Sequence, residues 1–131
     1  MKEILFRGKR KDNGEWVEGD LIHRQIWKRS IAIIRVLDDG FEHYEEYEVI
    51  PETVSQFTGL TDKNSKKIFE GNIIAKGFEL YEVRWNPEQV RWGIYSDDYE
   101  VAGFTKFSEP YFEVIGNVYD NPKLIKKLIK K

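Results

Sequence analysis

The sequence lacks cysteine entirely and has only one methionine, two histidines and four prolines among its 131 residues. Without cysteine there can be no disulfide, no thiolate zinc site and no cysteine nucleophile, which fits a reducing compartment. No apolar run approaches the roughly 20 residues that a membrane-spanning helix requires. The opening residues, MKEILFRGKRKD, also lack the apolar centre and small-residue cleavage site of a signal peptide. We therefore expect a cytoplasmic protein with no membrane partner.

A strong excess of one charge is missing too. The 21 basic and 23 acidic side chains leave a formal net charge of −2, whereas a general DNA-coating protein is strongly basic. What the chain does have is 40% apolar and 15% aromatic residues, with many Val and Ile. This composition supplies a buried core and favours β-sheet over a helix bundle. At this length we expect one compact domain, or two small lobes that share a core.

The N-terminal residues predict a hairpin. Asn13-Gly14 is a strong two-residue turn signal, because both central residues of a type I′ turn need positive φ. A turn at this pair sets Lys11 opposite Trp16 and joins strands over residues 3–10 and 15–21. We expect residues 23–29 to form a surface loop. Two further strands, over 30–37 and 41–50, then complete an N-terminal lobe.

A second hairpin carries the main charged pair of the chain. Strands over residues 80–85 and 90–95 flank a four-residue loop, which sets Arg84 opposite Arg91. Like charges in that position destabilise a sheet, so either Glu82 relieves them diagonally or they meet an anion. Apolar side chains alternate onto the opposite face, which we expect to be core: Tyr81, Val83, Trp85, Val90, Trp92 and Ile94.

Between the hairpins lies a stretch rich in Thr, Gly and charged residues, from Pro51 to Ile74. Thr53 is positioned to cap a short helical turn, which Gly59 would end in the left-handed conformation. Asp62–Lys66 is a turn cluster, and Gly71 supplies a bend before the next short strand. We interpret the stretch as a connector into the C-terminal half, whose distinctive residues serve backbone geometry rather than chemistry.

The chain ends in a predicted amphipathic helix that follows two further strands, over residues 101–107 and 111–119. Asn121 is a good N-cap, and Pro122 suits the first helical position. Apolar residues at i, i+1, i+4 and i+5 then form one stripe, which can dock on this chain or on a neighbouring copy. The tail lysines offer an alternative contact with phosphates: Lys126, Lys127 and Lys130.

Candidate catalytic and metal-binding groups are sparse. His23 and His43 are far apart, and of the carboxylates near His43 only Glu45 shares its side of a strand. We expect the acidic clusters at residues 42–52 and 97–100 to be solvated faces. The sequence has no Ser-His-Asp context, no nucleophile elbow and no phosphate loop. We predict no catalytic residue, no metal and no cofactor.

Three blocks of the chain carry a family signature: RGKRKDNGEWVEGDLI at 7–22, ETVSQFTGLTDKNSKKIFEGNII at 52–74 and EVIGNVYDNPKLI at 113–125. In this order they resemble the YopX family of small prophage-encoded proteins of Gram-positive bacteria. The resemblance implies a β-rich fold with a small, partly open SH3-like barrel in its C-terminal half, and self-association, but it brings no activity. One departure is Glu70-Gly71-Asn72, where the family tends to show Glu-Gly-Asp. The missing carboxylate speaks against a metal or acid–base site at this turn.

These inferences give a mainly β protein of the β-rich α+β class. We expect an N-terminal hairpin and strand lobe (1–50), a small barrel entered through the connector (51–119) and a terminal helix (120–131). The first functional hypothesis is a non-enzymatic prophage accessory protein, a binding or assembly module that forms homo-oligomers and meets a host or phage protein. The alternative is a nucleic-acid-binding barrel that uses Arg84, Arg91 and the tail lysines, and a hydrolase or metal enzyme has the least support. We interpret the remaining motif residues as structural: Thr53, Gly59, Asp62, Glu70, Gly71, Gly116, Asn117 and Pro122.

Overall fold

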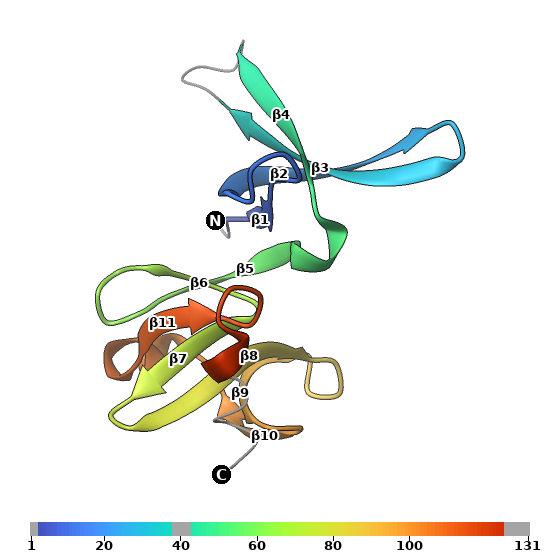
Figure 1. The fold of residues 1–131 in the computed structure, drawn as a ribbon. Coiled ribbons are helices and arrows are strands. Elements are labelled where there is room, and N and C mark those ends of the chain that lie inside the picture. Colours follow the sequence, from blue (N-terminus) through green and yellow to red (C-terminus); the bar gives the residue numbers. More distant parts are fainter. Residues whose placement is uncertain (1–2, 38–42, 125–131) are drawn as a thin grey trace. The chain divides into compact units, whose positions relative to one another are not determined.

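The computed structural model describes residues 3–37 and 43–124. Contacts divide the chain into two compact units, Met1–Phe57 and Thr58–Lys131, which we call unit 1 and unit 2. Figure 1 shows that strands dominate both units, which confirms the expected mainly β fold. The elements in chain order are β1 (Phe6–Lys9), β2 (Trp16–Ile26), β3 (Arg29–Leu37), β4 (Tyr44–Val49), η1 (Pro51–Thr53), β5 (Ser55–Thr61), β6 (Lys67–Phe69), β7 (Asn72–Lys76), β8 (Glu79–Asn86), β9 (Arg91–Ser96), β10 (Tyr99–Gly103), η2 (Lys106–Tyr111) and β11 (Glu113–Asn117).

Unit 1 is built on an antiparallel sheet in which the strands follow the order β4-β3-β2-β1-β5. The run SIAIIRVL supplies β3, and its residues Ile31–Ile34 are all buried, as expected for a continuous apolar run. The core cluster of this unit consists of Ala32, Ile34 and Val49, against which other apolar side chains pack: Phe6, Val17, Leu21, Val36 and Val54.

The first hairpin forms as predicted, but its predicted register is wrong. Lys9, and not Lys11, lies opposite Trp16. The connection is wider than two residues, because the Arg10 N–H donates to the carbonyl of Glu15 at 2.9 Å. Hydrogen bonds across this wider loop therefore fix the pairing, and the Asn-Gly pair lies inside the loop instead of forming all of it.

The predicted loop at residues 23–29 is also wrong. β2 continues to Ile26, which pairs with Arg29 of β3, so only Trp27 and Lys28 form the turn. Cross-strand pairing with the strongly β-forming β3 outweighs the weak strand propensity of this polar run. Figure 1 shows the β2–β3 hairpin extending away from the other strands of unit 1.

The predicted helix cap at Thr53 does not form. Pro51–Thr53 make a single 3-10 turn, and Thr53 ends that turn instead of capping its start. The Thr53 hydroxyl donates to the carbonyl of Ile50 at 2.6 Å and accepts from the N–H of Lys9 at 2.9 Å. Gly59 has the expected positive φ, +87°, but it lies within strand β5 and not at a helix end.

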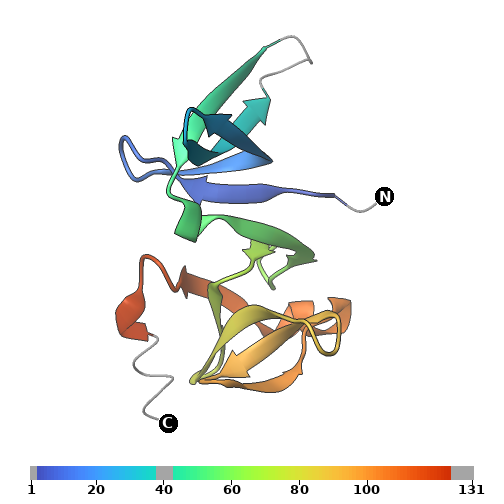
Figure 2. The same cartoon turned by 90° about the vertical axis from the view of Figure 1, so that its right-hand side faces the viewer.

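Unit 2 holds a second antiparallel sheet with the strand order β10-β9-β8-β7-β11, while β6 pairs with β5. Figures 1 and 2 show this sheet curling on itself. Its described strands close no barrel, because β10 and β11 end the sheet on opposite sides. The core cluster contains Ile68, Ile74, Val83, Ile94, Phe104, Phe112 and Val114.

The β8–β9 hairpin is displaced by two residues from the predicted register. Arg84 lies opposite Gly93 instead of Arg91. The loop begins after Asn86, whose side-chain oxygen accepts from two N–H groups of the loop at 3.0 and 3.1 Å. A shift of two residues preserves the face of every side chain. The strand side chains that share the apolar face are therefore predicted correctly, but Val90 leaves the strand for the loop. The prediction that Trp85 belongs to the core is wrong, because this residue is 42% exposed and packs edge-on against Trp92.

The C-terminal strands are shorter than predicted. β10 ends at Gly103, and Phe107 lies in the 3-10 helix Lys106–Tyr111 instead of a strand. The predicted terminal helix begins at Pro122, and residues 122–124 are helical. The rest of that predicted helix lies outside the described residues.

Candidate functional site

The polar face of β8 and β9 holds the two arginines of the predicted anion site. Arg84 donates from Nη2 to Oε1 of Glu82 at 2.9 Å, and its guanidinium lies 4.9 Å from the ring centroid of Tyr95. Arg91 forms an ion pair with Glu100 of β10. Each arginine therefore has its own carboxylate within the sheet.

Gly93 leaves the space that the second ion pair occupies. A Cβ at this position would lie 2.1 Å from Oε2 of Glu100. Asn86 Nδ2 also donates to that oxygen at 3.0 Å. Hydrogen bonds from Arg91 and then Asn86 lower the pKa of Glu100, and Glu100 in turn raises the pKa of Arg91. The like-charge repulsion that suggested a bound anion does not occur, because Arg84 and Arg91 are diagonal neighbours with separate acidic partners.

The other basic candidates, Lys126, Lys127 and Lys130, lie outside the described residues. The turn that leads toward them is built from the third motif block. Asn117 is buried, and its Oδ1 accepts from the N–H groups two and three residues on, at 3.0 and 2.9 Å. Asn121 Oδ1 accepts from the N–H of Asn117 at 3.0 Å, and a Cβ at Gly116 would lie 2.4 Å from that oxygen. These residues position the start of the helix at Pro122.

Asp62 organises the turn after β5. Its side chain is only 4% exposed, and its carboxylate accepts from the N–H groups of Asn64 at 2.8 Å, Lys66 at 2.9 Å and Val114 of β11 at 2.9 Å. Burial raises the pKa of this carboxyl, but the backbone N–H groups outweigh burial and the net pKa is lowered. The ionised side chain therefore anchors the turn to β11.

The Glu70-Gly71-Asn72 turn joins β6 to β7, and polar groups of Gly71 and Asn72 form hydrogen bonds with backbone groups of the same unit. Gly71 has a φ of +84°, donates to the carbonyl of Val83 at 2.8 Å and accepts from the N–H of Val118 at 2.9 Å. Asn72 is 2% exposed, and its side-chain oxygen accepts from the N–H three residues earlier at 2.7 Å. The amide that replaces the expected carboxylate thus has a structural partner.

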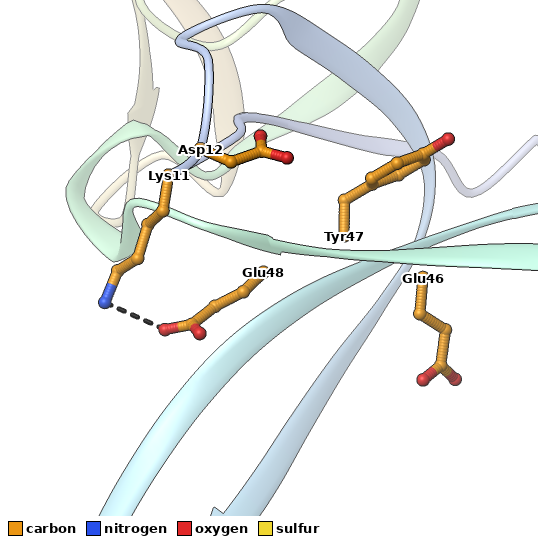
Figure 3. A pocket seen from close by; sticks show the side chains of 5 residues that line it. All are labelled: Lys11, Asp12, Glu46, Tyr47 and Glu48. Atoms are coloured by element: carbon orange, nitrogen blue, oxygen red, sulfur yellow. Dashed lines mark ion pairs between the residues drawn. The ribbon is translucent and has the colours of Figure 1, made fainter.

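The acidic strand β4 borders an open cavity of about 300 Å³ in unit 1. Figure 3 shows Tyr47 and Asp12 on one side of this strand, and Glu46 and Glu48 on the other. Lys11 reaches Glu48 at 2.8 Å. The cavity is therefore lined by charged and aromatic side chains from β4 and from the loop between β1 and β2.

The two carboxylates on the side of β4 away from Tyr47, Glu46 and Glu48, both form ion pairs with basic side chains. Arg24 and Arg35 bind Glu46 at 3.0 and 2.7 Å, and these hydrogen bonds lower the pKa of Glu46. The hydrogen bond from Lys11 lowers the pKa of Glu48 in the same way. Both side chains stay ionised near neutral pH, so neither is tuned to act as a general acid.

Within the described residues, neither histidine belongs to a group of metal-binding side chains. His23 lies in β2 opposite Ala32, His43 precedes β4, and both are exposed. Glu45, the carboxylate expected beside His43, instead accepts from the hydroxyl of Tyr47, and this hydrogen bond raises the pKa of Tyr47. Across residues 3–37 and 43–124, no three ligating side chains gather around a common point.

The tip of the β2–β3 hairpin is a surface that the sequence analysis missed. Residues 23–30 are all exposed. Trp27 is 88% exposed and has a φ of +55°, and its neighbour Ile26 is 46% exposed. From Leu21 to Leu37 the sequence has four basic residues and no acidic one. The run without acidic residues was the sequence feature that indicated a basic surface here. The turn itself was not predicted, because it contains no glycine or asparagine.

A second exposed surface lies at the end of the unit 2 sheet where β7 turns into β8. Phe78 in that turn is 100% exposed, and Tyr111, 62% exposed, has its ring 5.5 Å from Nζ of Lys76. Tyr99, 64% exposed, begins edge strand β10 at the same end. A hydrogen bond to Glu79, then burial, then the charges of Glu79 and Tyr99 raise the pKa of the nearby Tyr81 to about 12. We call this surface the aromatic end: Phe78, Tyr81, Tyr99 and Tyr111.

The fold and these surfaces define a small β-rich protein of two antiparallel sheets, with exposed aromatic side chains and ion-paired carboxylates. The family model described as YopX protein matches residues 5–126. The chain therefore belongs to the YopX family, as its three sequence blocks indicated.

A solved structure has the same fold. The crystal structure of protein EF1440 from Enterococcus faecalis superposes with a TM-score of 0.62 over 95% of this chain and 99% of that chain, at 20% sequence identity. At this identity the likeness shows the fold alone. A comparison with curated proteins gives no match. In the part of the chain that the structure describes, no helix has the length and apolar character to cross a membrane.

Proposed function

We propose that this YopX-family protein is a non-enzymatic assembly module that forms homo-oligomers through the aromatic end of unit 2. The family resemblance supports a prophage accessory protein in the cytoplasm of a Gram-positive host, where the oligomer meets a host or phage protein. The observation that carries the proposal is the complete exposure of Phe78, together with the exposure of Tyr99 and Tyr111 around the same end of the sheet.

Exposed aromatic rings favour association because a partner removes their apolar surface from water. Full burial of a Phe side chain contributes about 2 kcal/mol. Tyrosine is enriched at interface centres, since its ring is rigid and its hydroxyl can bond at the rim. Phe78 lies outside the core cluster of its own unit, and Tyr99 and Tyr111 place two further exposed rings at the same end of the sheet. A group of exposed apolar side chains in one place is typical of an interaction surface, whereas single exposed apolar residues are common.

A second copy of the chain is the partner that this surface fits best. An apolar patch can cover the same patch on a second copy around a two-fold axis, which buries both sets of rings at once. Tyr99 lies on β10, an edge strand that has a neighbour on one side only in the described sheet. No other described strand pairs with the outer side of β10, so that edge can pair with a strand of another chain.

The competing functions have weaker support. Nucleic-acid binding through Arg84 and Arg91 competes with the carboxylates of Glu82 and Glu100, which already hold the two guanidinium groups. An acid–base role for β4 would need a carboxyl with a raised pKa, whereas the pKa values of Glu46 and Glu48 are lowered.

Mass measurement in solution tests the proposal. Analytical ultracentrifugation of the full chain at micromolar concentration should show an oligomer. Phe78→Ser with Tyr99→Ser should shift the distribution toward monomer, because the two changes remove the exposed rings without touching the core.

Val90→Asn is the matched control. Val90 is also an exposed apolar residue, 71% exposed, but it lies in the loop at the opposite end of the β8–β9 hairpin. Its replacement should leave the oligomer intact. A wild-type chain that stays monomeric at micromolar concentration, or an oligomer that both variants leave unchanged, would reject assembly through the aromatic end.

A further inference from the structure

The tip of the β2–β3 hairpin presents an aromatic ring at a position that disfavours it. Trp27 is the first central residue of a two-residue turn, where Gly, Asn or Asp supplies positive φ at little steric cost. A bulky residue at a φ of +55° is a backbone outlier. With the side chain 88% exposed, little burial offsets that strain. The indole is therefore poorly explained by the stability of its own hairpin, and strained residues of this kind concentrate at binding sites.

Positive charge accompanies the ring. The hairpin segment from Leu21 to Leu37 contains four basic residues and no acidic one. Its two inner arginines share Glu46, at 3.0 and 2.7 Å. Lys28 and Arg29 stand further out, at and beside the turn. Glu48, whose pKa is lowered by Lys11 and also by the charge of Arg29, is bound to Lys11 at 2.8 Å. Among the described residues neither Lys28 nor Arg29 forms an ion pair, so the outer end of the hairpin presents positive charge to solvent in a protein whose net charge is negative.

An exposed indole flanked by cations matches the chemistry of an unpaired nucleotide. The ring can stack on a base, and the cations can contact the phosphates on either side. A duplex hides the faces of its bases within the stack, so it offers an indole no such contact without unstacking. A lipid surface is a poorer match, because Ile26 and Trp27 are the only apolar side chains among residues 23–30 and supply little area to insert.

We propose that the β2–β3 hairpin tip binds single-stranded nucleic acid, with the indole of Trp27 stacked on a base and Lys28 and Arg29 on the adjacent phosphates. This surface belongs to unit 1 and is independent of the aromatic end. It also differs from the arginine pair of β8 and β9, because its cations are not bound within their own sheet.

Fluorescence anisotropy of labelled oligothymidylate and oligouridylate with the full chain tests this proposal across a salt series. Trp27→Gly should weaken binding by about 5-fold to about 150-fold, the range expected for the loss of one stacked base. The melting temperature should stay the same or rise, because glycine relieves the positive φ. Trp27→Phe keeps a ring in the same turn and should retain most of the affinity.

The salt dependence provides the second measurement. Each phosphate contact on a single strand contributes about 0.7 to the slope of log affinity against log salt. Lys28→Ala with Arg29→Ala should therefore reduce that slope by about 1.4. Arg84→Ala with Arg91→Ala is the matched control and should leave both the slope and the affinity unchanged.

Several results would overturn the proposal. The first is no binding of the oligonucleotides at low salt. The second is equal affinity of the wild type and the Trp27→Gly variant, or a loss of affinity only in the Arg84 and Arg91 variant. The third is tighter binding of a duplex than of a single strand of the same length, or binding confined to phosphatidylglycerol vesicles. Binding of either oligothymidylate or oligouridylate with the expected tip dependence supports it, and their ratio identifies which nucleic acid is preferred.

Discussion

Positive φ at residues other than glycine marks the points where this chain stores backbone strain. In the described residues these positions are Trp27, Ser65, Val90 and Asp97. Ser65 belongs to the turn that Asp62 organises, and its N–H donates to the Asp62 carbonyl at 3.0 Å. Asp97 is an aspartate, a residue type that tolerates the left-handed region. Val90 is different, because a β-branched side chain in this region clashes with its own backbone. Val90 is 71% exposed and belongs to neither core cluster of the described residues.

Val90→Asn should stabilise the protein by about 1 kcal/mol, since asparagine tolerates the left-handed conformation that valine resists. Thermal unfolding of the variant and the wild type measures the difference. Val90→Ala is the control, because alanine removes the apolar branches but keeps the strain of positive φ. An equal gain from Val90→Ala would show that exposure of the valine, and not its backbone, was the cause.

Asp62 lies in a polar turn, yet its carboxylate is buried and accepts hydrogen bonds from three backbone N–H groups. Asp62→Ala should destabilise the protein by about 3 kcal/mol, because three backbone N–H groups lose a charged acceptor and that of Val114 is buried. Urea unfolding provides the measurement. Asp98→Ala is the control, since the Asp98 side chain is 97% exposed, and it should change stability by less than about 0.5 kcal/mol. A loss below about 1 kcal/mol in Asp62→Ala would mean that water replaces the carboxylate.

At the scale of elements, strand identity follows from the sequence more readily than strand pairing. Both predicted hairpins form, and β3 is buried on both faces as its apolar run implies. Both registers are displaced by two residues. The side-chain oxygens of Asn13 in one loop and Asn86 in the other accept hydrogen bonds from backbone N–H groups, and these bonds help to set loop widths that the turn rules did not specify. The displacement is even, so each strand side chain keeps its predicted face. Two residues predicted for the apolar core face, Trp85 and Val90, are nevertheless exposed.

The candidate surfaces were harder to predict than the core, for two physical reasons. The predicted anion site at the arginine pair is not supported, because Glu100 on strand β10 binds Arg91 on the neighbouring strand β9. β10 contains a bulge, and the sequence does not reveal its register. The hairpin tip was hidden because its turn uses Trp27 and Lys28, residues that carry no turn preference. Periodicity reports which face is buried, but it does not report which exposed residues come together.

Close backbone approach between β2 and β3 rests on Gly19. A Cβ at this position would lie 2.1 Å from the carbonyl oxygen of Arg35, which is backbone and cannot rotate away. Gly19→Ala should therefore destabilise unit 1 by about 3 kcal/mol. Hydrogen exchange should show the loss of protection in β1, β2 and β3. Glu18→Ala, an exposed neighbour on the same strand, is the control, and equal protection in the two variants would mean that the strands separate at little cost.

At the scale of the whole molecule, a net charge near zero conceals extensive pairing of charges. Salt bridges connect strands in both sheets, for example Arg35 with Glu46 in unit 1 and Arg91 with Glu100 in unit 2. Exposed pairs contribute little individually, and salt screens them. Their collective effect appears where the carboxylates lose their charge, which makes stability depend on pH.

Stability should fall in acid, because five carboxyl groups have folded-state pKa values below their ordinary ones: Asp12, Glu46, Glu48, Asp62 and Glu100. A depressed folded pKa contributes stability that is present above the unfolded value, about 4 for these groups, and is lost as pH falls through the folded value. Urea unfolding at a series of pH values should show a plateau near neutrality and a decline below about pH 4. Glu46→Gln should flatten that decline, whereas Glu52→Gln, at an exposed position in η1, should leave its shape unchanged. A stability that stays constant through the acid range would show that these ion pairs and hydrogen bonds do not distinguish the folded chain from the unfolded one.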